Sequence, residues 1–248
     1  MMTADRPQFR RSALLFALVA AGIVFVLWNI PQLEFILYPF RLFVTFVHEA
    51  GHSVMAVLTG GRVIGFEVFS NGTGIATTAG GNRLLILPAG YLGAALFGAA
   101  LFYLTNTVPY PRKIALALGT LLILVSLYLR ATNIALVVGV VSGLALVFLG
   151  LRGGAAVNIL VLNVLALMTG LNAVLDLLFL ARNSDAGLNG IANDAAAFSA
   201  LTLGIPAVVW ALVWAALAVL MLAAAAWFSI GRHVRDEVNG LLEADRRS

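Results

Sequence analysis

Residues 42–58 read LFVTFVHEAGHSVMAVL, an apolar run that contains two histidines and one glutamate. The run is predicted to be helical, and residues four apart on a helix share a face, so His48 and His52 can point at one ion. Glu49 can reach a water bound to that ion, as the general base of a metallopeptidase does. Two of the chain's three histidines lie in this motif. The spacing therefore predicts a zinc site.

A histidine pair one turn apart is also found as an ordinary hydrogen-bonded pair in helix bundles. Ionisable groups at membrane depth are costly, however, and they are functional candidates by default. The run holds three such groups within five residues. We therefore favour the zinc site and keep a purely structural histidine pair as the alternative.

The composition places the chain among polytopic membrane proteins. Hydrophobic residues make up 62% of its 248 residues, charged residues make up 10%, and the mean hydropathy is +1.01. No soluble core needs that much apolar surface. The net charge of +4 comes from basic residues scattered singly at the ends of apolar runs, which fits lipid headgroups and topology signals rather than nucleic acid. Because the chain has no cysteine, any zinc must be bound by imidazole and carboxylate.

Several apolar runs approach the length of about 20 residues that a spanning helix needs. They cover 13–30, 42–58, 84–104, 114–129, 131–149, 157–180 and 205–230. The predicted fold class is an all-α polytopic membrane protein with about seven transmembrane helices, organised as one integral membrane domain over residues 1–248. The basic N-terminus predicts that the first run is a retained helix with its start in the cytoplasm. Residues 231–248 are expected to form a solvated or interfacial tail helix.

The segment between the second and third runs, residues 59–83, predicts a β-hairpin. Two β-prone stretches, 63–69 and 75–78, flank Asn71-Gly72, which is the strongest short-range hairpin signal. In a membrane protein such a hairpin must lie at the interface or line a protein-walled cavity, because lipid cannot satisfy its edges. It is either a surface connection or an edge strand beside the active site that pairs with an extended peptide.

Two histidines do not complete a catalytic zinc site, which takes three protein ligands and a water. Asp176 is the predicted third ligand, because it is the only acidic residue in 68–180 and an unpaired charge in its apolar run would be costly. Asn172 lies one turn earlier on the same face and is expected to bind the substrate backbone or hydrogen-bond the site. The alternative for Asp176 is an ion pair with Arg182 or Arg152.

Depth in the membrane gives a second argument for Asp176. With the N-terminus inside, the first run leads outward and the second and sixth lead inward, so that His52 and Asp176 both fall in the cytoplasmic third. Glu34 is the other nearby acid, but it is expected at the outer end of the first helix. The polar segment 182–204 is predicted to be a loop with a short helix at 194–198.

These features together resemble the site-2 protease family of intramembrane zinc metallopeptidases. The matching segments are FVHEAGH at 46–52, the glycine pair and hairpin that follow it, LPAGYLG at 87–93, and Asp176 preceded by Asn172. The likeness covers residues 42–180 and is nearest to a compact bacterial branch of peptidase-like members.

The resemblance implies that Glu49 activates a zinc-bound water to attack a peptide bond in a membrane-embedded protein substrate, with His48, His52 and Asp176 as ligands of Zn2+. It implies a multi-pass protein of a bacterial cell membrane, whose partners are the substrate and the lipid bilayer; the oligomeric state stays open. The alternative is a non-proteolytic membrane scaffold or metal-ion transporter with the same site. The sequence shows no internal repeat, which disfavours the transporter.

Overall fold

The computed structural model describes residues 6–183, 193–231 and 235. In this part of the chain the α-helices are α1 (Arg6–Asn29), α2 (Glu34–Leu58), α3 (Arg83–Thr107), α4 (Pro111–Tyr128), α5 (Asn133–Arg152), α6 (Ala155–Arg182), α7 (Asp194–Leu201) and α8 (Ala207–Ala226). A 3-10 turn, η1 (Pro31–Leu33), joins α1 to α2, and a π-helical turn, η2 (Trp227–Gly231), extends α8. Most of the expected tail helix lies outside the described residues.

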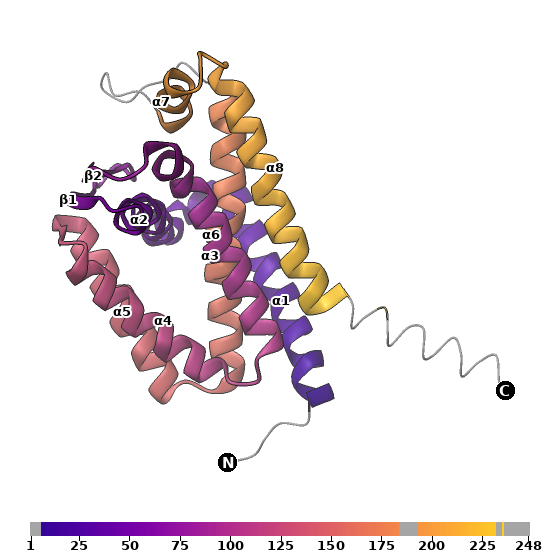
Figure 1. The fold of residues 1–248 in the computed structure, drawn as a ribbon. Helices are drawn as coiled ribbons and strands as arrows, with labels where there is room; N and C mark the ends of the chain where they lie inside the picture. The colour runs from indigo at the N-terminus through magenta and orange to yellow at the C-terminus, as the bar shows by residue number, and fades with distance from the viewer. Residues whose placement is uncertain (1–5, 184–192, 232–234, 236–248) are drawn as a thin grey trace.

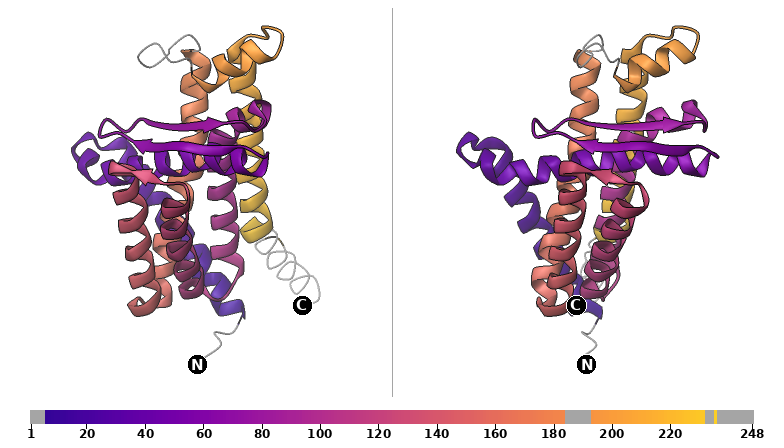
Figure 2. Two further views of the ribbon diagram at one scale, coloured as in Figure 1. Left: turned by 60° about the vertical axis from the view of Figure 1, so that its left-hand side comes forward. Right: turned by 90° about the vertical axis from the view of Figure 1, so that its left-hand side faces the viewer.

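Six of the described helices are long and apolar enough to cross a membrane: α1, α3, α4, α5, α6 and α8. The expected all-α polytopic fold is confirmed; α2, which contains the expected crossing at 42–58, is not among these six helices. Arg41, Glu49 and the two histidines interrupt the apolar sequence of α2. Figure 2 shows α2 lying crosswise to the long helices, along the two strands of the hairpin.

The predicted hairpin is present as strands β1 (Arg62–Val68) and β2 (Gly74–Ala79), which pair antiparallel. Gly72 lies in the turn with a φ of +87°, a conformation that favours glycine. A third strand, β3 (Ala131–Thr132), pairs parallel with β1 and gives the order β2-β1-β3. Since β3 lies between α4 and α5, it fastens this helix pair to the sheet and leaves β2 as an edge strand.

The helices form two groups (Figure 1). In one, α6 packs against α1, α3 and α8; in the other, α4 and α5 form an antiparallel pair that meets α2, the sheet and α6. Buried asparagines link α3 and α6, because Asn106 Nδ2 donates to Asn163 Oδ1 at 2.7 Å. Paired amides of this kind satisfy each other's polar atoms at membrane depth.

The two ends of the bundle differ in content. The first turn of α1, the last turn of α8, and the α3–α4 and α5–α6 connections lie at one end, whereas α2, the sheet and α7 lie at the other (Figure 1 and Figure 2). We call them the terminal end (6–11, 107–113, 150–155 and 225–231) and the sheet end (30–83, 128–133, 176–183 and 193–206). The expected position of the motif is therefore corrected: His52 and Asp176 lie at the sheet end, opposite to the start of α1, and not at the same end as the N-terminus.

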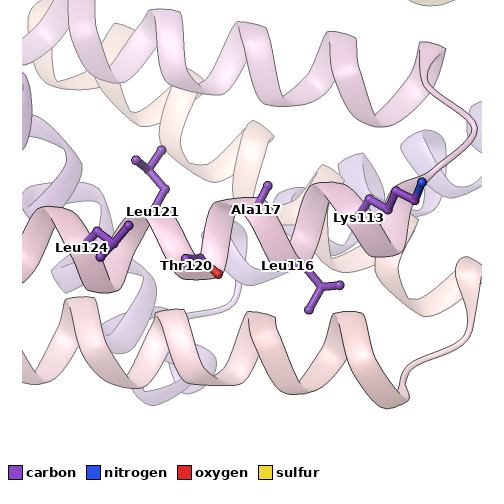
Figure 3. Close-up of a pocket in the computed structure, with 6 residues that line it drawn as sticks. All are labelled: Lys113, Leu116, Ala117, Thr120, Leu121 and Leu124. Atoms are coloured by element: carbon purple, nitrogen blue, oxygen red, sulfur yellow. The ribbon is translucent and has the colours of Figure 1, made fainter.

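A groove of about 570 Å³ runs along the outer face of α4. Its lining is Lys113, Leu116, Ala117, Thr120, Leu121 and Leu124 (Figure 3). It offers no imidazole or carboxylate. We interpret this groove as part of the lipid-facing surface, which is expected to be apolar.

Candidate metal centre

The histidines of the motif lie one turn apart on α2, and their Nε2 atoms are 3.0 Å apart. The Nδ1 atom of His52 lies 2.7 Å from the carbonyl oxygen of Ile86 on α3, to which its N–H donates. This hydrogen bond fixes the ring and the tautomer, and it leaves the lone pair of Nε2 for a metal ion. The structure therefore brings together the two imidazole nitrogens that the sequence singled out.

Glycines allow α3 to lie directly against this pair. A side chain at Gly90 would collide with the Nε2 atoms of both histidines, and one at Gly51 would collide with the carbonyl oxygen of Ala89. Only glycine fits where backbones and ligands approach so closely. Tyr91, the next residue on α3, packs edge-on against the His48 ring, with the ring centres 4.4 Å apart. The segment 87–93 thus forms one wall of the site.

The third group at the site is Asp194, the first residue of α7. Its Oδ2 lies 3.4 Å from His48 Nε2 and 3.2 Å from His52 Nε2. Among the described residues, these three side chains have donor atoms within 4.8 Å of one another. Burial alone would raise the pKa of Asp194, but when the Nε2 atoms of the histidines carry protons, the charge of His52 and hydrogen bonds from both rings outweigh it and hold the pKa well below its usual range. A metal ion bound to the Nε2 lone pairs would replace these protons and would stabilise the carboxylate in the same way. The carboxylate is therefore ionised and available to a cation.

Two features hold Asp194 in this place. Asn193 caps α7, because its side-chain oxygen accepts a hydrogen bond of 2.8 Å from the backbone N–H of Ala196. Phe198 packs edge-on against Trp210 and Trp214 of α8, with ring centres 4.7 and 5.3 Å apart. These contacts anchor the short helix that the sequence predicted at 194–198, and they direct its first residue toward α2.

The structure places Asp176 on α6, where its Oδ2 accepts a hydrogen bond of 2.6 Å from Asn172 Nδ2. Its charge interacts with His48 and Tyr91, so it is near the site, but it is not part of the group formed by the histidines and Asp194. Its role as third ligand stays a prediction. An ion pair with Arg152 is excluded, because that residue ends α5 at the terminal end.

Asp194 was not among the ligands predicted from the sequence. A lone acid in an apolar run is conspicuous, whereas an acid in a polar segment looks like an ordinary surface residue. The sequence does contain one local signal: an asparagine, Asn193, precedes a short apolar stretch, and this pattern marks the start of a helix. It indicates that Asp194 opens a helix but not that this helix folds back over α2.

Glu49 is buried, with 7% of its surface exposed, and it faces the start of β2. A side chain at Gly74 would come within 2.8 Å of Glu49 Oε1, and the backbone of Ala76 hydrogen-bonds the carboxylate. Glu49 therefore lies between the histidine pair on its own helix and the edge strand of the sheet.

The three donor atoms fit a single tetrahedral ion. Their separations are 3.0, 3.2 and 3.4 Å. Zinc binds imidazole nitrogen and carboxylate oxygen at about 2.0–2.2 Å, which separates two ligand atoms of a tetrahedron by about 3.3 Å. Two imidazoles and one carboxylate are a donor set that suits zinc, and three protein ligands leave one position for water.

Comparisons with known proteins agree with this geometry. The family model described as Peptidase M50B-like matches residues 16–225, a range that includes the motif helix, the sheet and both aspartates. No curated protein matches the chain, and no solved structure does.

Proposed function

The chain belongs to the Peptidase M50B-like family, and from this membership and the geometry of the site we propose that it is an intramembrane zinc metalloprotease of the site-2 protease type. The family and the six apolar helices together make it a multi-pass membrane protein with a metallopeptidase-type site. The observation that carries the proposal is the tight group of two imidazole nitrogens and one carboxylate oxygen beside a buried glutamate. Beyond the family, we propose that the bound ion is zinc and that the substrate is a membrane protein.

We assign the zinc to His48, His52 and Asp194. Zinc, when bound, lowers the pKa of a water and polarises the substrate carbonyl. Glu49 accepts the proton of the attacking water and then gives it to the amine that leaves, acting as base and then as acid. The hydrogen bond from His52 to Ile86 keeps the ring in place during this exchange.

We further propose that the substrate binds along β2. Among the described residues this strand pairs only with β1, so its other edge is open, and it contacts Glu49 at Gly74 and Ala76. A peptide that adds to the edge would be held extended by main-chain hydrogen bonds beside the base. Extension is required, because the peptide bonds of an intact helix are occupied by its own hydrogen bonds. Asn172, held by Asp176, is proposed to bind the backbone of the same segment.

The test compares the wild-type protein with Glu49→Gln, which keeps the size of the side chain and removes its basicity. Zinc content and cleavage of a membrane-protein substrate are measured on the same detergent-purified samples. We expect unchanged zinc in both proteins and cleavage only by the wild type. Zinc binding with no cleavage by the wild type, together with zinc uptake into proteoliposomes, would support the transporter alternative instead.

A further inference from the structure

The ring of Tyr91, on α3, is held beside the metal centre by contacts with two other helices. It lies edge-on against the ring of His48 on α2, with the ring centres 4.4 Å apart. It also stacks on the indole of Trp214, a buried residue of α8, with ring centres 6.4 Å apart and an angle of 29° between the planes. Because both neighbours limit the rotation of the side chain, the phenol is fixed next to a proposed metal ligand.

The hydroxyl of Tyr91 lies close to the acids of the site. Glu49, Asp176 and Asp194 all interact electrostatically with it, although they belong to three different helices, α2, α6 and α7. Such interactions fade with distance, so one phenol feels all three charges only if it lies near each of them. Tyr91 therefore presents its polar end to the same space as the proposed base and the carboxylate of the metal centre.

The same hydroxyl has no hydrogen-bond partner in the part of the chain that the structure describes. Tyr91 is half-buried, so its hydroxyl is not sealed in the core. Neighbouring donors are engaged, since Nδ1 of His52 donates to the carbonyl oxygen of Ile86. Likewise, Nδ2 of Asn172 donates to Asp176. A phenol donates one hydrogen bond, and that of Tyr91 is available to a molecule bound at the centre.

Hydrolysis of a peptide bond creates a negative charge that such a donor can stabilise. When the oxygen of a water bonds to the carbonyl carbon, Glu49 takes a proton from the water and the electron pair of the C=O bond moves to the carbonyl oxygen. Donors that are fixed in advance around this oxygen lower the barrier, because they need no reorientation as the charge develops. When the C–N bond breaks, the electron pair returns to the C=O bond and the proton passes from Glu49 to the leaving amine.

We propose that Tyr91 is a catalytic residue of this reaction and that its hydroxyl donates a hydrogen bond to the carbonyl oxygen of the substrate as that oxygen becomes negative. The inference rests on the proposed function and adds to it the group that stabilises the oxyanion. The phenol keeps its proton throughout, so it is neither the acid nor the base of the reaction. Its contacts with His48 and Trp214 hold the donor in place without a hydrogen bond of its own.

The test removes the hydroxyl and keeps the ring. Tyr91→Phe does this at the site, and Tyr103→Phe is the matched control, because it makes the same change at an exposed position about 18 Å farther along α3. Zinc content, kcat and KM are measured with the same membrane-protein substrate as for Glu49→Gln. Two inhibitors with the cleaved sequence are also compared: a phosphinic peptide, whose oxygens imitate the tetrahedral intermediate, and a thiol peptide, which binds a metal through sulfur and has no such oxygens.

We expect Tyr91→Phe to keep its zinc and its KM and to lose about 100- to 1000-fold in kcat, the usual cost of one oxyanion donor. Its affinity for the phosphinic peptide should fall at least about 10-fold, because a hydrogen bond to a charged oxygen is lost. Its affinity for the thiol peptide should be unchanged. Tyr103→Phe should behave as the wild type in every measurement.

An unchanged kcat in Tyr91→Phe would overturn the assignment. Loss of zinc from this variant, or an equal loss of affinity for both inhibitors, would also overturn it, because either result indicates that Tyr91 only supports the structure of the site. A wild-type protein that binds zinc but cleaves no substrate would refute the proposed function itself, and the catalytic role of Tyr91 with it.

Discussion

Replacement of Asp194 by Asn tests which carboxylate completes the metal centre. The change keeps the size of the side chain but removes the charge that lies 3.2 and 3.4 Å from the two histidine nitrogens. Asp176→Asn is the matched control, because it makes the same chemical change at the acid that the sequence favoured. If Asp194 is a ligand, only the first variant loses a direct bond to zinc.

The expected size of the effect follows from the ligand count. Structural zinc sites with four ligands bind with about 10–16 kcal/mol, or about 2.5–4 kcal/mol for each ligand. Losing one ligand should therefore weaken zinc binding at least about 100-fold. Removing a group that only supports a ligand costs about 10- to 100-fold. We expect Asp194→Asn to lose zinc affinity by the larger factor and Asp176→Asn by the smaller one.

The assay is competition for zinc between purified protein and a chromophoric chelator, with thermal unfolding in the metal-free state as a check on the fold. A cobalt-loaded sample adds a second measure, because its visible spectrum reports the number and kind of ligands. Unchanged zinc affinity in Asp194→Asn, together with a loss of 100-fold or more in Asp176→Asn, would refute the assignment of Asp194. It would restore the ligand set predicted from the sequence.

Three further predictions follow from the geometry of the site. Glu49→Gln should abolish cleavage and leave zinc content unchanged; residual cleavage above that of a blank preparation would rule Glu49 out as the base. Gly90→Ala should weaken zinc binding, because the added methyl group would collide with the Nε2 atoms of both histidines. The control is Gly22→Ala on α1, where an added methyl group meets nothing within 4 Å and zinc binding should be unchanged. Equal zinc affinities in the two variants would contradict the close contact of α3 with the site. Phe198→Ala should release α7 from the two tryptophans of α8, with a loss of stability of up to about 3–5 kcal/mol. Zinc binding should become weaker, but less so than in Asp194→Asn. Full zinc affinity in this variant would show that the aromatic contacts do not position Asp194.

The long helices and the hairpin could be predicted because their signals are local. Apolar length marks a spanning helix, and Asn71-Gly72 between β-prone stretches marks a hairpin. The two-residue strand β3 has no such signal, since it exists only through its pairing with Phe66 and Glu67. Its partner is more than 60 residues away, a distance over which a sequence pattern of two residues indicates nothing.

The course of α2 and the third member of the site could not be read from the sequence for a related reason. A helix that crosses lipid and one that lies across the end of a bundle can share the same apolar face, and only tertiary packing separates them. Asp176 was predicted as a ligand because its sequence neighbours are apolar. Asp194, in contrast, lies beside the histidines only because α7 packs against α8. The HEAGH motif was predictable because both imidazoles belong to one helix.

The most direct test of the metal centre is the zinc content of detergent-purified protein, measured by elemental analysis for the wild type and for the double variant His48→Ala/His52→Ala. We expect about one zinc per chain in the wild type and none in the double variant. Absence of zinc from wild-type protein that was protected from chelators and offered the metal again, or retention of zinc by the double variant, would contradict the assignment.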